Sequence, residues 1–205
     1  NYLKNVDKNK YNIYIHYKHN KQLKYFENNK IDNCISTCWG CLSIVEAQII
    51  LLKHTLKDKN NTHIVWLSDS CVPLKSFDYI YNYLDHSKSY FNISPDKQVF
   101  PRCDKLIKFI EKNKIKKAAM QSILNRKHAQ LFVDNETNIK KWFKNINVSD
   151  EITFITLLHH FNMEKEVVST PNLAANAIIF TGWSDMSNYK KFKESVLIKK
   201  TPNTY

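Results

Sequence analysis

The amino-acid sequence predicts one α/β domain, a sandwich in which helices flank a largely parallel or mixed central sheet. Two observations support this fold class. Segments with the alternating or continuous apolar character of strands take turns along the chain with segments of helical apolar spacing. The chain also has 205 residues, of which 43% are hydrophobic, enough for one substantial core and too few for two full domains. We therefore expect a single domain over residues 1–205.

The first half of the chain predicts a strand, a helix and a second strand. Residues 11–16 (YNIYIH) alternate between apolar and polar side chains, which is typical of a strand. A helix is expected to begin at Ser43, because Ser43 and Glu46 have the spacing of a capping box, and to continue through Leu56. Residues 63–67 (HIVWL) form a continuous apolar run and predict a fully buried strand. Together these elements predict a β-α-β unit.

Shorter elements follow in the second half. Strands are predicted at residues 90–93, 121–124 and 177–180. The helical patterns fall at residues 77–84, 105–112, 127–132, 139–143, 151–160 and 189–196. This alternation of strands and helices continues the pattern that favours the α/β class.

The composition argues against several classes of protein. The formal net charge is +12, yet only two of the 31 basic residues are arginine, the side chain on which readers of nucleic-acid grooves depend. We therefore expect no nucleic-acid partner, although a basic nucleic-acid-binding protein stays an alternative. The chain contains two glycines, whereas dinucleotide-binding and phosphate-binding loops need several at fixed spacing. No apolar run approaches the roughly 20 residues that cross a bilayer, so we expect no membrane contact from this segment.

The cysteines predict neither disulfides nor a metal site. There are five of them, an odd number, and no secretion signal precedes them, which favours reduced thiols and a cytoplasm-like environment. The cluster Cys34-x3-Cys38-x2-Cys41 lacks the second pair of ligands that a closed zinc site requires. We expect no metal and no other cofactor.

Two groups of polar residues are candidates for chemistry. Asp69 and Ser70 follow the predicted strand at 63–67, and ligands of α/β sheets bind beyond the carboxyl ends of strands. Alternatively, these two residues only close a turn before Pro73. Asp150 and Glu151 stand directly before an apolar run, where acids either perform chemistry or satisfy the free N–H groups and dipole of a first helical turn.

Several blocks of the sequence resemble those of the core-2/I-branching glycosyltransferase family, especially its plant-type branch. In that branch a Trp-Gly pair, a helix rich in Ala and Leu, and an LLS(E/D)SCIPL segment follow one another, as in residues 39–84, WGCLSIVEAQIILLKHTLKDKNNTHIVWLSDSCVPLKSFDYIYNYL. Further similar blocks are KAAMQSILNRKHAQLFVDN (117–135), VSDEITFITLL (148–158) and, more loosely, NAIIFTGWSD (176–185). The blocks occur in the family's order over most of the chain.

The resemblance implies a fold and a reaction. The implied fold is a GT-A-like, Rossmann-type sandwich. The implied reaction is an inverting transfer of a sugar, most often N-acetylglucosamine or xylose, from a UDP-sugar to a hydroxyl of an acceptor glycan. The implied partners are thus a nucleotide sugar and a glycan. Family members work without the metal-binding Asp-x-Asp motif, and this chain contains none. A relative that binds glycan or nucleotide sugar without turnover is the alternative.

The resemblance also implies roles for individual residues. Glu151 occupies the position of the general base, and one base is sufficient for inversion at the anomeric carbon. Its neighbour Asp150 orders the loop or touches the acceptor. The remaining assignments, each of which has a packed and hydrogen-bonded residue as its alternative, are donor binding by His16, Asp69 and Ser70 and acceptor binding by Gln121, Asn125, Arg126 and Trp183.

The resemblance bears on the chain's extent and its compartment as well. The family's first strand and its basic C-terminal segment have no counterpart here, so the chain is expected to be an internal piece of a longer protein. Lys199 and Lys200 are candidates to replace the basic residues that stabilise the departing UDP. Eukaryotic members of the family are anchored in Golgi membranes, whereas the cysteine usage favours a reducing compartment, so the compartment stays open.

Overall fold

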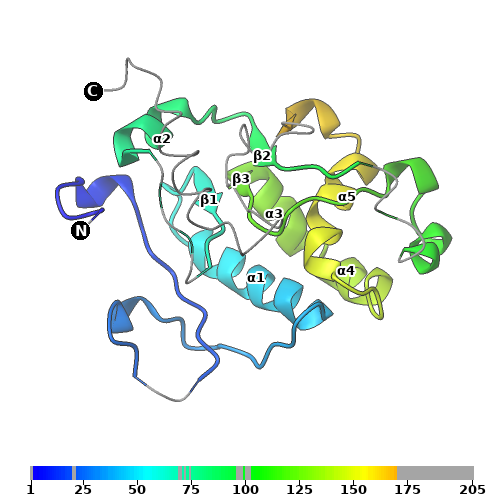
Figure 1. The fold of residues 1–205 in the computed structure, drawn as a ribbon, viewed down its shortest axis with the longest axis horizontal. Helices are drawn as coiled ribbons and strands as arrows, with labels where there is room; N and C mark the ends of the chain where they lie inside the picture. The colour runs from blue at the N-terminus through cyan, green and yellow to red at the C-terminus, as the bar shows by residue number, and fades with distance from the viewer. Residues whose placement is uncertain are drawn as a thin grey trace, which may run out of the picture.

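The computed structural model describes residues 2–19, 22–68, 71, 73, 75–95, 99 and 103–169 (Figure 1). The strands of this part form one four-stranded sheet in the order β1-β3-β2-β4. Figure 1 shows α1, α3, α4 and α5 gathered on one side of the strands, with α2 apart from them. The predicted α/β class, with a mixed sheet flanked by helices, is confirmed and is compatible with a GT-A-like fold.

The sheet is built from very short strands. They are β1 (His63–Val65), β2 (Ser89–Phe91), β3 (Ile123–Asn125) and β4 (Val167–Ser169). The strand β3 runs antiparallel to both β1 and β2, whereas β2 and β4 are parallel. The carboxyl ends of β1, β2 and β4 therefore lie at the edge of the sheet where β3 begins.

The α-helices lie close to their predicted positions. Their bounds are α1 (Leu42–Thr55), α2 (Phe77–Tyr83), α3 (Arg126–Asp134), α4 (Glu136–Trp142) and α5 (Thr153–His160). Single turns of 3₁₀ helix connect the larger elements: η1 (Lys8–Lys10), η2 (Glu27–Asn29), η4 (Asp104–Lys108), η5 (Lys112–Lys114), η6 (Ser149–Glu151) and η7 (Glu164–Glu166).

Three predictions at the N-terminal side of the fold are wrong. Residues 11–16 are not a strand of the sheet, because their ladder is one isolated parallel bridge between Ile15 and Lys30, so the β-α-β unit is not formed. The capping box is also absent: Cys41 is the N-cap of α1, and Ser43 Oγ accepts a hydrogen bond from Cys38 N–H instead. Finally, β1 is not fully buried, since Val65 is 42% exposed on an edge strand.

Of three further predicted elements, one differs from the structure and two lie outside the described residues. The helix expected at residues 105–112 is replaced by η4 and η5, and no side chain caps either turn to favour a continuous helix. The strand and helix expected at residues 177–180 and 189–196 lie outside the part of the chain that the structure describes.

The core lies between α1, α3 and α5. Phe132 of α3 and Phe154 of α5 pack with ring centroids 4.6 Å apart. All residues of α5 from Thr153 to Leu158 are buried, including Leu157 and Leu158 with no exposed surface. Burial of each such leucine contributes roughly 1.5–3 kcal/mol. The helix α5 is therefore firmly anchored, and it fixes the position of the η6 turn that precedes it.

Candidate active site

Asp150 and Glu151 lie in η6, directly before α5. The turn is fixed to its surroundings by two hydrogen bonds of 2.7 Å, in which Thr153 Oγ1 donates to the Ser149 carbonyl and Ala118 N–H donates to the Glu151 carbonyl. No side chain caps the start of η6 or of α5. The Asp150 carboxylate does accept hydrogen bonds from the backbone N–H groups of Asp150 and Glu151, so satisfying the free N–H groups of the turn stays open as the alternative explanation for the acids.

Glu151 forms an ion pair with Lys117. The distance between Glu151 Oε2 and Lys117 Nζ is 3.0 Å, and the two side chains are 22% and 20% exposed. Lys117 is itself held in place, because its carbonyl accepts a hydrogen bond of 2.8 Å from Ser94 N–H and the preceding Lys116 is hydrogen-bonded in both directions to Thr156 of α5. The carboxylate of Glu151 is therefore oriented by a fixed cation while it still reaches the surface.

Asp150 has a different environment from its neighbour. Its Oδ1 atom is buried and, within the described residues, has no hydrogen-bond partner. Burial raises the pKa of Asp150, and the negative charge of Glu151 raises this pKa further. Buried carboxylates with perturbed pKa values are frequent at functional sites. The turn thus presents two adjacent acids of unequal character: Glu151 pairs with Lys117, whereas the Asp150 carboxylate is bonded to backbone N–H groups of the turn itself.

The residue before η6 has an unusual backbone. Val148 adopts φ 56° and ψ 41°, the left-handed region, which is a true outlier for a β-branched residue. Such a conformation costs of order 1–3 kcal/mol and is retained where the surroundings enforce it. Here Val148 N–H donates a 2.8 Å hydrogen bond to the Gly40 carbonyl, and Gly40 is itself left-handed at φ 69°. The loop before α1 therefore packs directly against the turn that carries the acids.

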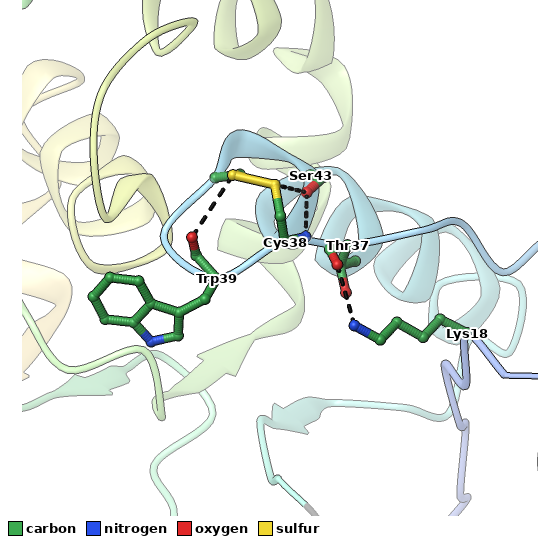
Figure 2. Close-up of a disulfide and its surroundings, with 6 residues drawn as sticks. Lys18, Thr37, Cys38, Trp39 and Ser43 are labelled. Carbon is green, nitrogen blue, oxygen red and sulfur yellow. Dashed lines mark hydrogen bonds between the residues drawn. A yellow bond between two sulfur atoms is a disulfide. The ribbon is translucent and has the colours of Figure 1, made fainter.

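That loop is closed by a disulfide between Cys38 and Cys41, drawn in Figure 2. The expectation of reduced thiols is wrong for this pair, whose Cα atoms are 5.5 Å apart, within the usual range for a disulfide. The odd number of cysteines misled because it cannot show which residues pair, and the three others form no disulfide: Cys34, Cys71 and Cys103. The spacing Cys-x-x-Cys was the signal in the sequence that could have indicated the bond.

His16, a predicted donor-binding residue, lies in the N-terminal segment beside the approach to this loop. Its Nε2 atom accepts a 3.0 Å hydrogen bond from Ile35 N–H, and burial lowers the pKa of the imidazole. Two residues further on, Lys18 Nζ donates to the Thr37 carbonyl at 3.2 Å, as Figure 2 shows. The structure gives His16 a packing role, and its contact to a donor stays a prediction.

The predicted acceptor residues on and around β3 do not lie together. Gln121 is half-buried and precedes the strand on the side of Ala118 and Glu151. Asn125 is the last residue of the strand, and Arg126 follows it at that other end. Asn125 is 1% exposed and caps α3, because its Oδ1 atom accepts from His128 N–H at 2.8 Å.

Arg126 holds the end of α1. Its guanidinium donates to the carbonyls of Leu56 and Asp58 at 2.7 Å and to that of Asn61 at 3.2 Å. No local pattern around Arg126 indicates these contacts, which join α1 to the start of α3. Acceptor binding by Gln121, Asn125 and Arg126 stays a prediction, and the remaining predicted site residues lie outside the described part of the chain: Asp69, Ser70 and Trp183.

A second cluster of polar residues has a structural role. His128 Nδ1 lies 2.7 Å from Ser89 Oγ and its Nε2 lies 3.1 Å from Glu166 Oε2, an order that resembles a nucleophilic triad. However, Ser89 and His128 have no exposed surface, and Ser89 Oγ also accepts a hydrogen bond from Asn125 N–H at 2.8 Å. Because no substrate can reach this serine, the cluster joins β2, β3 and α3 rather than performing chemistry.

The described residues contain neither a cluster of metal-binding side chains nor a helix that could span a membrane. No group of three or more His, Cys, Asp or Glu side chains there could hold a metal ion. None of the helices in the same part of the chain is both long enough and apolar enough to cross a membrane.

Comparisons with known proteins identify the family. The sequence profile described as "Core-2/I-Branching enzyme" matches residues 2–201. Glycosyltransferase BC10 of Oryza sativa subsp. japonica is 35% identical to this chain over 124 residues, which are 58% of this chain and 30% of that protein. The chain thus matches less than a third of the length of this curated relative. The similarity to a rice protein supports the plant-type branch predicted from the sequence. Because the profile covers nearly the whole chain, the protein belongs to the Core-2/I-branching enzyme family.

Proposed function

We propose that this chain is the catalytic part of an inverting glycosyltransferase that transfers a sugar from a UDP-sugar to a hydroxyl of an acceptor glycan. N-acetylglucosamine and xylose are the expected donor sugars. The observation that supports the proposal most strongly is the η6 turn, in which two acids of unequal environment follow a strained residue in a member of this family. Strained backbone next to an acid with a perturbed pKa, here Asp150, is typical of functional sites.

Glu151 is the proposed general base. In an inverting transfer the acceptor oxygen forms a bond to the anomeric carbon while the bond to UDP breaks on the opposite face. The proton of the acceptor hydroxyl must pass to a carboxylate during this attack. The Lys117 ammonium, 3.0 Å from Glu151 Oε2, would hold the carboxylate in one orientation as a positioning residue. Asp150, whose pKa is raised by burial, would then contact the acceptor and is the second candidate for the base.

The transfer is proposed to need no metal ion, because the sequence contains no Asp-x-Asp motif. In the absence of such an ion, cationic side chains would have to stabilise the charge that develops on the departing UDP.

A binding protein without turnover is the second candidate. The observation that favours it is the same ion pair, since the Lys117 ammonium occupies Oε2, one of the two oxygens of Glu151 that could take the proton. In this case donor and acceptor would bind, while the proton transfer would not occur.

UDP release by the full-length protein distinguishes the two candidates. A panel of UDP-sugars would be tested with and without acceptor glycans, and the melting temperature would be recorded with each donor. Release that depends on both a donor and an acceptor supports the transferase. A donor that raises the melting temperature without any release supports the binding protein, because a ligand that binds only the native state stabilises it. If no donor causes UDP release or raises the melting temperature, both candidates are refuted.

A further inference from the structure

Trp39 is the most exposed large hydrophobic side chain in the described part of the chain. Its exposed fraction is 88%, and it lies between the two cysteines of the disulfide. A lone exposed leucine or valine is ordinary, but tryptophan has the largest apolar surface of any side chain and is on average highly buried. Exposed tryptophans are enriched where proteins meet ligands and partners, because the ring offers a large apolar face with a polar edge.

We propose that Trp39 is a stacking platform for a pyranose ring of the substrate, held beside η6 by the Cys38–Cys41 disulfide. This inference rests on the proposed glycosyl transfer. One face of a pyranose carries C–H groups and packs against an aromatic ring, while the hydroxyls at its rim keep their hydrogen bonds.

The backbone on both sides of Trp39 is fixed. The disulfide joins Cys38, directly before it, to Cys41, two positions after it, and Cys41 N–H donates to the Cys38 carbonyl at 3.2 Å. Cys38 N–H is bound in turn by Ser43 Oγ of α1, at 3.1 Å. Figure 2 shows the indole projecting away from the disulfide, on the side of the loop opposite Lys18. A platform on a rigid loop loses little conformational freedom when it binds a ring, which favours affinity.

The position of the loop connects Trp39 to the candidate base. The residue after Trp39 is Gly40, whose carbonyl accepts the 2.8 Å hydrogen bond from Val148, and Glu151 follows Val148 by three residues. A β-carbon added at Gly40 would lie 3.6 Å from Val148 N, so the two backbones are in direct contact. The loop that carries Trp39 thus contacts the turn that would take the proton, and because the acceptor hydroxyl must meet that turn, we assign the stacked ring to the acceptor sugar.

Steady-state kinetics of Trp39→Ala in the full-length protein test the proposal. With the best donor and acceptor from the UDP-release panel, we expect the acceptor KM to rise at least tenfold. The KM for UDP-sugar should stay within twofold, and the melting temperature should be unchanged, because the side chain packs against little. Trp39→Phe should restore most of the acceptor affinity. The matched control is Tyr25→Ala, which removes another exposed aromatic ring, 68% exposed, and should change neither KM.

Each other outcome has a defined meaning. If Trp39→Ala raises the KM for UDP-sugar instead, the platform is confirmed and its ring belongs to the donor. If neither KM changes, or if the melting temperature falls with no change in KM, Trp39 is a packing residue and the proposal is wrong.

Direct binding separates the failure of this inference from the failure of the proposed function. If the wild-type protein releases no UDP with any pair, saturation-transfer NMR with N-acetyllactosamine and with UDP-N-acetylglucosamine still tests the platform. Binding of either probe to wild type that is lost in Trp39→Ala supports it. Binding of neither probe, or equal binding to both proteins, overturns it.

The role of the disulfide is tested by a combined variant. Cys38→Ala with Cys41→Ala should raise the acceptor KM by threefold or more, and should have no added effect when Trp39→Ala is already present. Such non-additivity is expected when two changes act through one group. An added effect in the triple variant would show that the disulfide acts on the substrate by some route other than Trp39, which would refute this part of the proposal.

Discussion

Glu151→Gln separates catalysis by the η6 acids from their contribution to stability. The substitution keeps the shape of the side chain and removes its charge, so Lys117 loses the ion-pair partner that now lies 3.0 Å away. A hydrogen bond to a charged group contributes about 1.5–3 kcal/mol when buried, whereas an exposed ion pair contributes about 0.2–1 kcal/mol. Both side chains are about one-fifth exposed, so we expect the free energy of unfolding to fall by about 1–2 kcal/mol.

The expected effect on rate is larger than the effect on stability. Removal of a general base lowers kcat by roughly 10²- to 10⁴-fold, which corresponds to about 2.7–5.5 kcal/mol of activation free energy. The affinity for UDP-sugar should change little, because the donor does not depend on the base. Denaturant unfolding, donor titration and UDP release from the full-length protein measure the three quantities separately.

Asp150→Asn is the matched comparison. Burial raises the pKa of Asp150, so its charge is held at a cost, and the neutral amide should leave stability unchanged or slightly higher near pH 7. Its turnover should fall less than that of Glu151→Gln. If Glu151→Gln keeps near wild-type turnover while Asp150→Asn loses it, our assignment is wrong and Asp150 is the base. If neither variant loses turnover selectively, the acids have only a structural role.

The remaining predictions concern the metal, the fold, the pH and nucleic acid. Turnover should survive EDTA, and loss with EDTA that Mn²⁺ restores would refute the metal-free proposal. Arg126→Met should lower the unfolding free energy by about 2–3 kcal/mol, because the variant loses the hydrogen bonds of the charged guanidinium. The acceptor KM should stay within twofold. A selective rise in the acceptor KM would establish the predicted acceptor role instead. Burial lowers the pKa of His128 below its ordinary value, so as the pH falls the imidazole takes up a proton in the unfolded chain before it does so in the folded protein. The free energy of unfolding should therefore fall as the pH drops below about 6.5. Thermal unfolding from pH 8 to 5 should show a smaller loss of stability in His128→Gln than in the wild type. Binding to duplex DNA at physiological salt should be no tighter than about 10⁻⁶ M, and a sequence-selective nanomolar complex would contradict this expectation.

The sequence predicted the elements whose pattern is local. The apolar spacing of α1 and the buried run of α5 are visible in the sequence, and the resemblance located Asp150 and Glu151. Prediction from the sequence failed where contacts with residues far along the chain determine the local structure. Residues 11–16 have the pattern of a strand, but Ile15 bonds to the backbone of Asn29 and Ile31 instead of joining the sheet.

The same limit applies to the site. The partner of Glu151 is Lys117, 34 positions earlier in the chain, and no local pattern indicates such a pair. Ser43 and Glu46 have the spacing of a capping box, yet Ser43 binds Cys38 because the disulfide loop brings that N–H within 3.1 Å. Tertiary contacts thus override local preference at the residues closest to the candidate chemistry.

The disulfide affects how the protein should be prepared. Cys38 and Cys41 are three positions apart, so their bond restricts the unfolded chain little, by about 2 kcal/mol on a chain-entropy estimate compared with about 3 kcal/mol for a 15-residue loop. A protein purified under reducing agent should therefore remain folded, with a normal circular dichroism spectrum and a melting temperature lowered by about 4–8 °C. Its Trp39 loop would nevertheless be open. Thiol titration of each preparation, rather than a stability assay, would show which form has been assayed.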